Sequence, residues 1–200
     1  MYIGRILESK PLPMNQFDTM NVAKIATEHL ASITEPRRRQ VLQNFIDHAT
    51  AEANGDYDAL MASCSRKKQE YATFGSSFGA PQSYEELEVH YRGLIESNIY
   101  LIHLEVEKLI VGTDALLVEG IVHQLYPGQL IKPIHGIEVE DTSAVYQLTK
   151  RSSITFVFDE DGLGAGEQAY SEGPTTAADL TRLDPEEVPE QFYANPLAAA

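Results

Sequence analysis

Apolar residues in the first half of the chain recur at spacings of three and four, which is the period of an amphipathic helix. The clearest stretch covers residues 38–54 and predicts a long helix, with Pro36 where such a helix can begin. Asn54 and Gly55 end it. Its apolar face comprises Val41, Leu42, Phe45, Ile46, Ala49 and Ala53.

Shorter helices are predicted on both sides of this segment. Asp56 can cap a second helix that runs to Cys64. Ser83 is followed three residues later by Glu86, a capping box that opens a third helix. A short amphipathic helix is also expected over residues 21–33.

The second half changes to long runs rich in β-branched and alternating residues, which favour strands. A brief strand over residues 71–74 precedes them. Helices followed by strands are an α+β order, and the sheet must curve over the helices to bury its inner face. We therefore predict a cone of three N-terminal helices packed on a strongly curved antiparallel sheet. The long strands are expected over residues 99–111, 115–126 and 144–158, with a last strand ending near Ser171.

Composition divides the chain into three segments. Pro11 and Pro13 interrupt the opening stretch, so residues 1–35 are expected to form an arm with one short helix. Residues 36–173 form the cone domain. After Gly173 the chain becomes rich in Pro, Thr, Glu and Ala, and residues 174–200 are expected to form a tail.

Charge and composition exclude several partners. The 15 basic and 30 acidic residues give a formal net charge of −15, which repels nucleic acid. No run approaches the roughly 18 apolar residues of a membrane span. The start of the chain has no apolar signal core, so we expect a cytoplasmic protein with a small-molecule substrate and no membrane partner.

The sequence predicts no metal site and no cofactor. Six histidines are present, but no two have a short ligand spacing such as His-x-x-x-His. The single cysteine, Cys64, lies in an apolar stretch and is expected to be buried. The glycine-rich run 162–166 leads into a strand and offers no helix N-terminus for a phosphate.

Three motifs carry a resemblance to a known family. Asn54-Gly55-Asp56-Tyr57-Asp58-Ala59-Leu60-Met61 resembles the junction between the first two helices of ketosteroid isomerases and SnoaL-like proteins. His90-Tyr91-Arg92-Gly93-Leu94 is similar to their third-helix motif, and Phe158-Asp159-Glu160-Asp161-Gly162 with Gln168-Ala169-Tyr170 resembles their final hairpin. The resemblance covers about residues 38–172. It implies the nuclear-transport-factor-2-like (NTF2-like, SnoaL-like) superfamily, a cystatin-like α+β barrel with one deep apolar pocket, and a homodimer or higher homo-oligomer.

The isomerase machinery does not carry over. Its helix-one tyrosine falls on His48, its general base on Ala72 and its oxyanion-hole aspartate on Ile154. Ala cannot move a proton and Ile cannot hydrogen-bond an enolate. The Arg and Asp that epoxide hydrolases of the superfamily need fall on Gly120 and Val122. Both activities are therefore disfavoured.

Three residues are predicted to be catalytic. His48 has Glu52 one turn later, which is the spacing of an acid–base pair, although a solvent-edge histidine fits the same spacing. His90 replaces an aromatic residue that lines the isomerase pocket, so it is either a ligand contact or ordinary packing. The resemblance to epoxide hydrolases and dehydratases implies that Tyr71 hydrogen-bonds the substrate, unless the strand slips and Glu70 points inward.

Further residues are expected to bind substrate. Alternation along residues 115–126 puts Glu119 and His123 on one face and a second set on the other: Val118, Gly120, Val122, Gln124 and Tyr126. The resemblance to the isomerases implies that this second set faces the pocket, which leaves Glu119 and His123 outside, at a dimer surface. His103 could face either way. The predicted substrate-binding residues are Glu52, Thr73, Phe74, Tyr91, Gln124, Tyr126 and Phe156.

The leading functional hypothesis is a cofactor-independent lyase or dehydratase that uses general acid–base catalysis on an apolar, oxygenated aromatic molecule. A lignin-derived phenolic dimer that undergoes diarylpropane deformylation is one such substrate. Polyketide cyclases and isomerases are the first alternative. A non-catalytic binding or assembly subunit, such as the β-subunit of a ring-hydroxylating dioxygenase, is the second.

Overall fold

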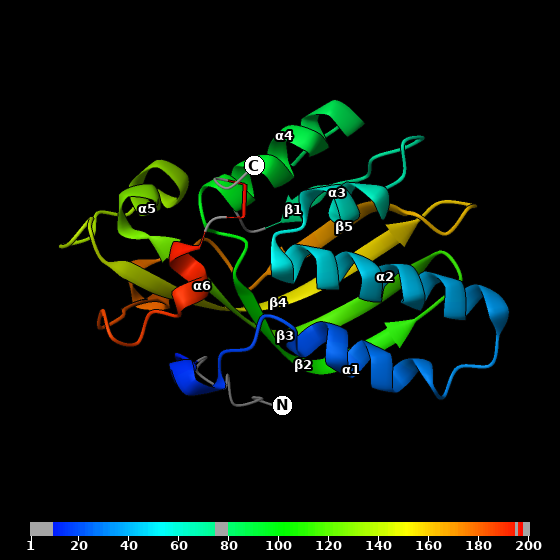
Figure 1. Ribbon diagram of the computed structural model, residues 1–200, viewed down its shortest axis with the longest axis horizontal. Coiled ribbons are helices and arrows are strands. Elements are labelled where there is room, and N and C mark those ends of the chain that lie inside the picture. The colour runs from blue at the N-terminus through cyan, green and yellow to red at the C-terminus, as the bar shows by residue number, and fades with distance from the viewer. Residues whose placement is uncertain (1–9, 75–79, 195, 198–200) are drawn as a thin grey trace, which may run out of the picture.

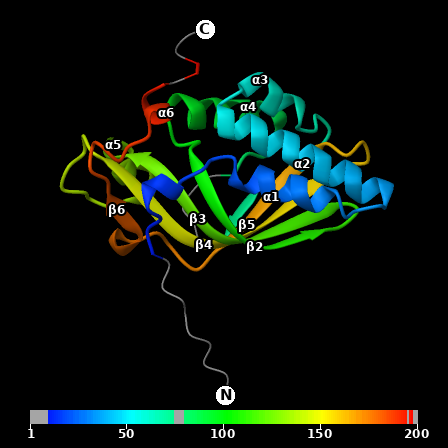
Figure 2. The ribbon, with the colours of Figure 1, turned by 60° about the horizontal axis from the view of Figure 1, so that its bottom comes forward.

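The computed structural model describes residues 10–74, 80–194 and 196–197 of the chain. A curved sheet forms one layer, and the longer helices cover one of its faces (Figures 1 and 2). The fold is α+β with the predicted cone architecture. In chain order the helical elements are η1 (Met14–Gln16), α1 (Asn21–Leu30), α2 (Pro36–Asn54), α3 (Tyr57–Ala62), α4 (Tyr84–Glu96), α5 (Gly128–His135), η2 (Ala177–Asp179) and α6 (Glu190–Tyr193).

Within the described residues the sheet has six strands in the order β1-β5-β4-β3-β2, and β6 pairs with β4. All neighbouring strands are antiparallel except β1 and β5, which are parallel. The four long strands, β2 to β5, form the predicted antiparallel sheet, and the parallel β1 makes the whole sheet mixed. No hairpin joins β1 to β5, so their relative direction is not constrained by a tight turn. The strands are β1 (Ala72–Phe74), β2 (Ile102–Val111), β3 (Ala115–Pro127), β4 (Val145–Phe158), β5 (Gly164–Ser171) and β6 (Leu180–Arg182).

The helix ends follow the capping signals of the sequence. The Asp56 side chain accepts a hydrogen bond from the backbone of Ala59 at the start of α3. Ser83 accepts one from the backbone of Glu86 and caps α4. At the end of α2, Gly55 adopts the left-handed conformation, with φ 64°. These caps determine where the helices that surround the cavity begin and end.

A β-bulge bends the sheet over the helices. The register between β2 and β3 shifts between Val106 and Lys108. Opposite this shift lies Gly120, where an added Cβ would collide with the backbone carbonyl of Glu105. Bulges bend a strand and increase its twist, so a residue without a side chain is required at the point of curvature.

Two apolar clusters form the core. One lies between α2 and the inner face of β2 and β3, and includes Leu42, Phe45 and Val118. The other surrounds α3 and α4 and includes Leu60 and Leu87, both fully buried. Tyr91, Leu94 and Tyr126 of the second cluster also line a cavity.

The described residues at the two ends of the chain pack against this body. The sequence predicts a tail after residue 173, but β6 pairs with β4, and Leu183 and Phe192 lie in the core. At the other end, the backbone of Leu12 exchanges hydrogen bonds with the side chain of Gln147, and Asn21 donates to the carbonyl of Leu104. The segments described in these regions therefore complete the fold.

Candidate functional site

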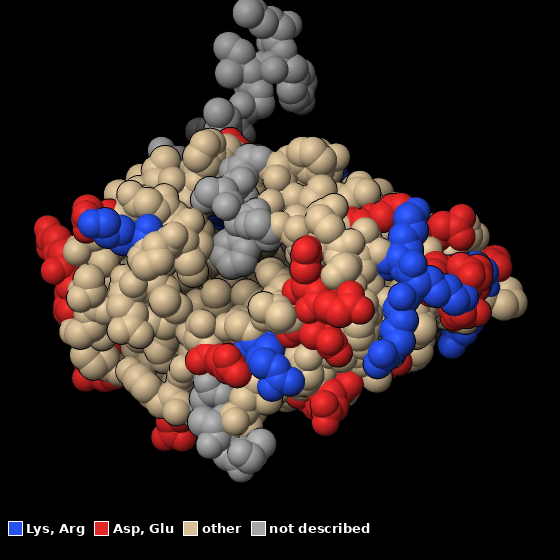
Figure 3. Space-filling view, turned by 90° about the horizontal axis from the view of Figure 1, so that it is seen from above, with Lys and Arg blue, Asp and Glu red and all other residues tan. Residues whose placement is uncertain are grey.

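A cavity of about 230 Å³ lies between the inner face of the sheet and helices α2 and α4. Alternation along the strands decides which side chains reach it, because successive residues point to opposite faces. Figure 3 shows a broad, mostly uncharged area on one face of the molecule, hollowed near its middle, with acidic and basic side chains gathered to its sides. The inward residues are Val122, Gln124 and Tyr126 from β3, Leu148, Lys150 and Ser152 from β4, and Glu167, Ala169 and Ser171 from β5.

His48 of α2 is held behind the cavity wall and is 6% exposed. Its Nδ1 lies 2.8 Å from the hydroxyl oxygen of Ser63. That hydroxyl donates its own proton to the carbonyl of Leu60 at 2.6 Å, so it accepts from His48. The geometry therefore assigns a proton to Nδ1.

The other ring nitrogen of His48 faces a tyrosine and a carboxylate. The hydroxyl of Tyr91 donates to Oε1 of Glu167 at 2.9 Å, and its oxygen lies 3.1 Å from His48 Nε2. Because the tyrosine proton is already committed, Nε2 must donate to that oxygen. Both ring nitrogens are then protonated, and His48 is an imidazolium. Its Nε2 lies 3.6 Å from Glu167 Oε1, which makes the two an ion pair.

The pKa shifts agree with this assignment. Burial of the His48 ring opposes its charged form, but contacts with Cys64 and Glu167 prevail and raise the pKa of His48 well above its ordinary value. Burial likewise acts to raise the pKa of Glu167, but hydrogen bonds with His48 and Tyr91 and the charge of His48 bring it below the ordinary value. An imidazolium beside a carboxylate follows from both directions.

Glu52, also on α2, lines the same cavity and is half-buried. Burial raises its pKa from 4.5 to about 7; the charge of His48 acts in the opposite direction, and that of Glu167 adds to the rise. A carboxyl group with this pKa exchanges protons near neutral pH, which is the property of an efficient general acid or base. Glu52 is thus the titrating group of the site.

Two more polar side chains, Tyr71 and His90, complete the site. The hydroxyl of Tyr71 lies 3.2 Å from that of Tyr91, and burial raises the pKa of both phenols, so both stay protonated. His90 of α4 lines the cavity with its ring 5.4 Å from that of Tyr91. Burial lowers the pKa of His90 and favours its neutral form.

The structure thus brings most of the residues predicted for the site together. Thr73, Gln124 and Tyr126 line the cavity with the groups above. The inward direction of Tyr71 settles the strand register against the alternative in which Glu70 points inward. His48 is not at the rim but behind Tyr91, so it acts on the cavity through its neighbours.

Two predicted substrate-binding residues lie outside the cavity. Phe74 is 47% exposed and stacks on Tyr170 at 4.4 Å, because alternation from Tyr71 and Thr73 turns it outward. Phe156 packs edge-on against Phe45 at 4.7 Å. It belongs to the packing around His48.

Sequence reasoning missed Glu167, the partner of His48. The prediction paired His48 with its helical neighbour Glu52, which lines the cavity instead. Glu167 comes from β5, far along the chain, and no local spacing connects the two. The available signal was its place in an inward row with Ala169 and Ser171, where a charged residue stands among small ones.

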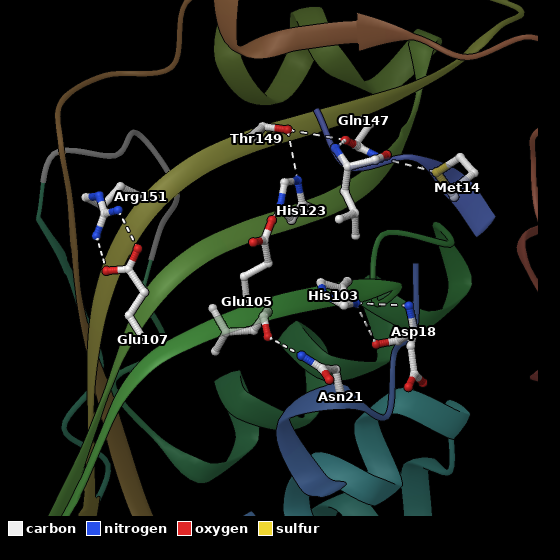
Figure 4. A network of polar contacts seen from close by, with 12 residues as sticks. Met14, Asp18, Asn21, His103, Glu105, Glu107, His123, Gln147, Thr149 and Arg151 are labelled. Atoms are coloured by element: carbon white, nitrogen blue, oxygen red, sulfur yellow. Dashed lines mark hydrogen bonds and ion pairs between the residues drawn. The ribbon is translucent and has the colours of Figure 1, made fainter. Parts of the chain in front are cut away.

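The outer face of the sheet carries a separate polar network (Figure 4). His123 is completely buried there; its Nε2 lies 2.7 Å from Glu105 and its Nδ1 3.1 Å from Thr149. The Nδ1 of His103 contacts the backbone of Asp18. Both histidines therefore point away from the cavity and are outside the site.

Two negative findings concern the described residues only. Among residues 10–74, 80–194 and 196–197, no group of three His, Cys, Asp or Glu side chains is arranged to hold a metal ion. In the same part of the chain, no helix is long and apolar enough to cross a membrane.

Solved structures of other proteins share the fold of this chain. A scan against models of protein families finds no match, and neither does a search of curated proteins. Among solved structures, a protein described as a SnoaL-like polyketide cyclase from Shewanella putrefaciens aligns with TM-score 0.52 at 10% identity, over 76% of this chain and 88% of that chain. An LEH-like epoxide hydrolase from Mycobacterium tuberculosis aligns with TM-score 0.51 at 12% identity, over 70% and 83%.

A second SnoaL-like protein, from Shewanella denitrificans, aligns with TM-score 0.51 at 11% identity, over 69% of this chain and 92% of that chain. At such identities the likeness concerns the fold alone. The chain has the SnoaL-like, NTF2-like cone fold that its motifs predict. Val122, one of the two positions expected from the sequence to match the Arg and Asp of epoxide hydrolases, lines the cavity.

Proposed function

We propose that this protein is a cofactor-independent enzyme of the lyase or dehydratase type, which moves protons on an apolar, oxygenated aromatic molecule. The observation that carries the proposal is the ion pair of His48 and Glu167, bridged by Tyr91 at the wall of the cavity. Imidazolium, carboxylate and phenol groups in a partly dehydrated site are the components of general acid–base catalysis.

The cavity-facing groups divide the chemistry among them. Glu52, with a pKa of about 7, takes a proton from the substrate or returns one. Tyr71 also lines the cavity; because the proton of Tyr91 goes to Glu167, the phenol of Tyr71 donates to the oxygen of Tyr91 and its own oxygen accepts a hydrogen bond from a substrate hydroxyl. His48 and Tyr91 are positioning residues that hold Glu167 ionised and oriented, so that its carboxylate accepts a proton in the cavity. The charged His48 also compensates negative charge that develops on a substrate oxygen.

The lining of the cavity supports an apolar ring-bearing substrate. Leu94, Ile102 and Leu148 supply aliphatic contacts, and Tyr126 adds an aromatic face. Ligand sites of this type are mostly apolar, with a few placed polar groups. At about 230 Å³ the cavity is smaller than the usual range of about 300–1,000 Å³ for ligand sites.

A phenolic diarylpropane-1,3-diol is the substrate that we propose in detail. Ionisation of its phenol expels the benzylic hydroxyl as water and forms a quinone methide. Loss of the proton from the primary hydroxyl then breaks the adjacent carbon–carbon bond, releases formaldehyde and returns the electron pair to the ring. The diol is thus converted to a stilbene, one water and one formaldehyde. All atoms are accounted for, and no oxidant or reductant is required.

The test is turnover of a phenolic diarylpropanediol, followed by stilbene absorbance and by formaldehyde release. The wild-type protein should form both products in equal amounts. Glu167→Gln should reduce the rate, whereas Glu28→Gln, an exposed change on α1, should not. Wild-type protein that forms neither product contradicts the detailed substrate. Equal rates for wild type and Glu167→Gln contradict the acid–base assignment.

A non-catalytic assembly subunit remains the proposal from another class. It predicts a pocket plugged by large apolar side chains, whereas Glu52, Tyr71 and Glu167 face an open cavity here. That arrangement favours an enzyme. Polyketide cyclisation or isomerisation would use the same proton-transfer groups and is distinguished by its product, which contains every atom of the substrate.

A further inference from the structure

One buried nitrogen in the cavity lining has no hydrogen-bond partner among the described residues. His135 lies at the end of α5 and lines the cavity, and its ring meets that of Tyr126 edge-on at 5.1 Å. Its Nε2 is buried, yet it makes no hydrogen bond to any of the described residues. Buried polar atoms are almost always hydrogen-bonded, because an unpaired one costs about 1–3 kcal/mol.

The neighbours of His135 are already engaged. Gln124 donates to the carbonyl of Ile99 at 2.6 Å and accepts from the hydroxyl of Tyr126 at 3.0 Å. These bonds fix the orientation of both side chains. The oxygen of Tyr126 keeps a free lone pair, since it acts as the donor in its bond to Gln124.

Lys150 does not turn this end of the cavity into an anion site. Its ammonium group contacts the carbonyls of Gly173 and Pro174 at 2.8 and 2.9 Å and Asp179 at 3.4 Å. An ammonium has three protons, so these three contacts use all of its donors. Lys150 therefore binds the segment that follows β5, residues 173–179, to strand β4.

His135 itself is neutral. Two effects lower the pKa of His135: burial, which is the larger, and the positive charge of Lys150. A neutral imidazole has one donor and one acceptor, so the buried nitrogen can match a hydroxyl, an ether oxygen or a carbonyl, but offers no charge to a carboxylate.

The strand register places this polar group far from the reacting groups. Glu167 pairs with Phe156, whereas Gln124 pairs with Leu148, eight positions away along β4. At about 3.3 Å per residue this is roughly 26 Å of strand path, shortened in space by the curvature of the sheet. A ligand that contacts both ends is elongated and carries a polar group at each.

We propose that His135, supported by Gln124 and Tyr126, forms a second subsite that hydrogen-bonds a neutral oxygen substituent at the remote end of the substrate. The subsite rests on the proposed function only in so far as the cavity binds an aromatic molecule. It selects two-ended substrates with a remote hydroxyl or ether oxygen, and disfavours those with a remote carboxylate.

Two probes isolate the contact: 4,4′-dihydroxystilbene and 4-hydroxystilbene, which differ in one hydroxyl. Their dissociation constants are measured by calorimetry with wild type, His135→Phe and His135→Gln. His29→Phe on α1, outside the cavity, is the matched control. Wild type and the control should bind the dihydroxy probe about 5- to 15-fold more tightly, the value of one hydrogen bond.

In His135→Phe this preference should fall to about twofold or less, and His135→Gln, which keeps a polar group, should restore part of it. A preference that is unchanged in His135→Phe overturns the subsite, and so does failure of wild type to bind either probe. The measurement needs no turnover. Loss of the preference in His135→Phe, together with normal catalysis by Glu167→Gln, would therefore support the subsite while contradicting the catalytic proposal.

Discussion

His48 Nε2 lies 3.6 Å from Glu167 Oε1, although one residue belongs to the long helix α2 and the other to the strand β5. Tyr91 bridges them, with hydrogen-bond distances of 3.1 Å to His48 and 2.9 Å to Glu167. Neither charged group reaches full solvent, so each depends on the other for compensation. The rest of the site is arranged around this pair.

Glu167→Gln should remove the compensating charge while keeping the size of the side chain. The pKa of His48 should fall, because burial then opposes its charged form. Turnover should decrease by about 100-fold or more, the usual effect of losing a group involved in proton transfer. Steady-state kinetics of Glu167→Gln beside Glu28→Gln measures this. A loss of less than about threefold would contradict the role given to Glu167.

Tyr91→Phe should mainly reduce stability, whereas Tyr71→Phe should mainly reduce turnover. Tyr91 bonds to two charged partners, so its replacement should lower the free energy of unfolding by about 2–3 kcal/mol. The hydroxyl of Tyr71 bonds only to Tyr91 among the described residues, so its replacement should cost about 1 kcal/mol but reduce kcat. Denaturant unfolding together with kinetics separates the two. Equal stability losses would contradict the proton assignment at Tyr91.

Glu52 should make stability depend on pH. Its folded-state pKa of about 7 lies above the ordinary 4.5, so the folded state binds the proton more tightly than the unfolded state. The contribution of Glu52 to stability is therefore fully present below pH 4.5, and it is lost as the pH rises to about 7. The loss amounts to at most about 3 kcal/mol.

Glu52→Gln should abolish this dependence, so it should be more stable than wild type at pH 8 and similar to it near pH 4.5. His48 also contributes stability that falls with rising pH, because its pKa is raised. Both the wild type and Glu52→Gln contain His48, so the difference between their stability curves leaves out the contribution of His48. Parallel stability curves between pH 4.5 and 8 would show that Glu52 is not the titrating group.

Gly120→Ala should destabilise the fold, since its Cβ would collide with the carbonyl of Glu105 across the bulge. We expect a loss of about 2 kcal/mol or more. Gly93→Ala on α4 is the matched control: no described atom lies within 4 Å of its added Cβ, and alanine favours a helix by about 0.5–1 kcal/mol. Thermal unfolding compares them, and a neutral Gly120→Ala would contradict the close approach.

Local sequence signals predicted the helices that surround the site and their caps, because capping depends on residues three or four apart. Asp56 and Ser83 cap their helices as expected. By contrast α5 was not predicted: it is short, contains Pro133, and begins where Gly128 approaches the carbonyls of Asp141 and Ala144. Its position is determined by tertiary packing.

The site itself was predicted in part for the same reason. Alternation along β3 grouped Gln124 with Tyr126, and the resemblance to the isomerases placed this group correctly on the inner face. It could not determine which distant residue faces His48, because the approach of β5 to α2 depends on the curvature of the whole sheet. The outward turn of Phe74 follows from a register that the sequence left open.

The charge state of His48 tests the account most directly, and its measurement requires no substrate. Nitrogen-15 NMR of labelled imidazole rings distinguishes a doubly protonated ring from either neutral tautomer. We expect both ring nitrogens of His48 to carry protons at pH 7 in the wild type, because its pKa is raised well above the ordinary value, and one of them to lose its proton at a lower pH in Glu167→Gln than in the wild type. A neutral His48 ring at pH 7 in the wild-type protein would contradict the ion pair on which the proposed chemistry depends.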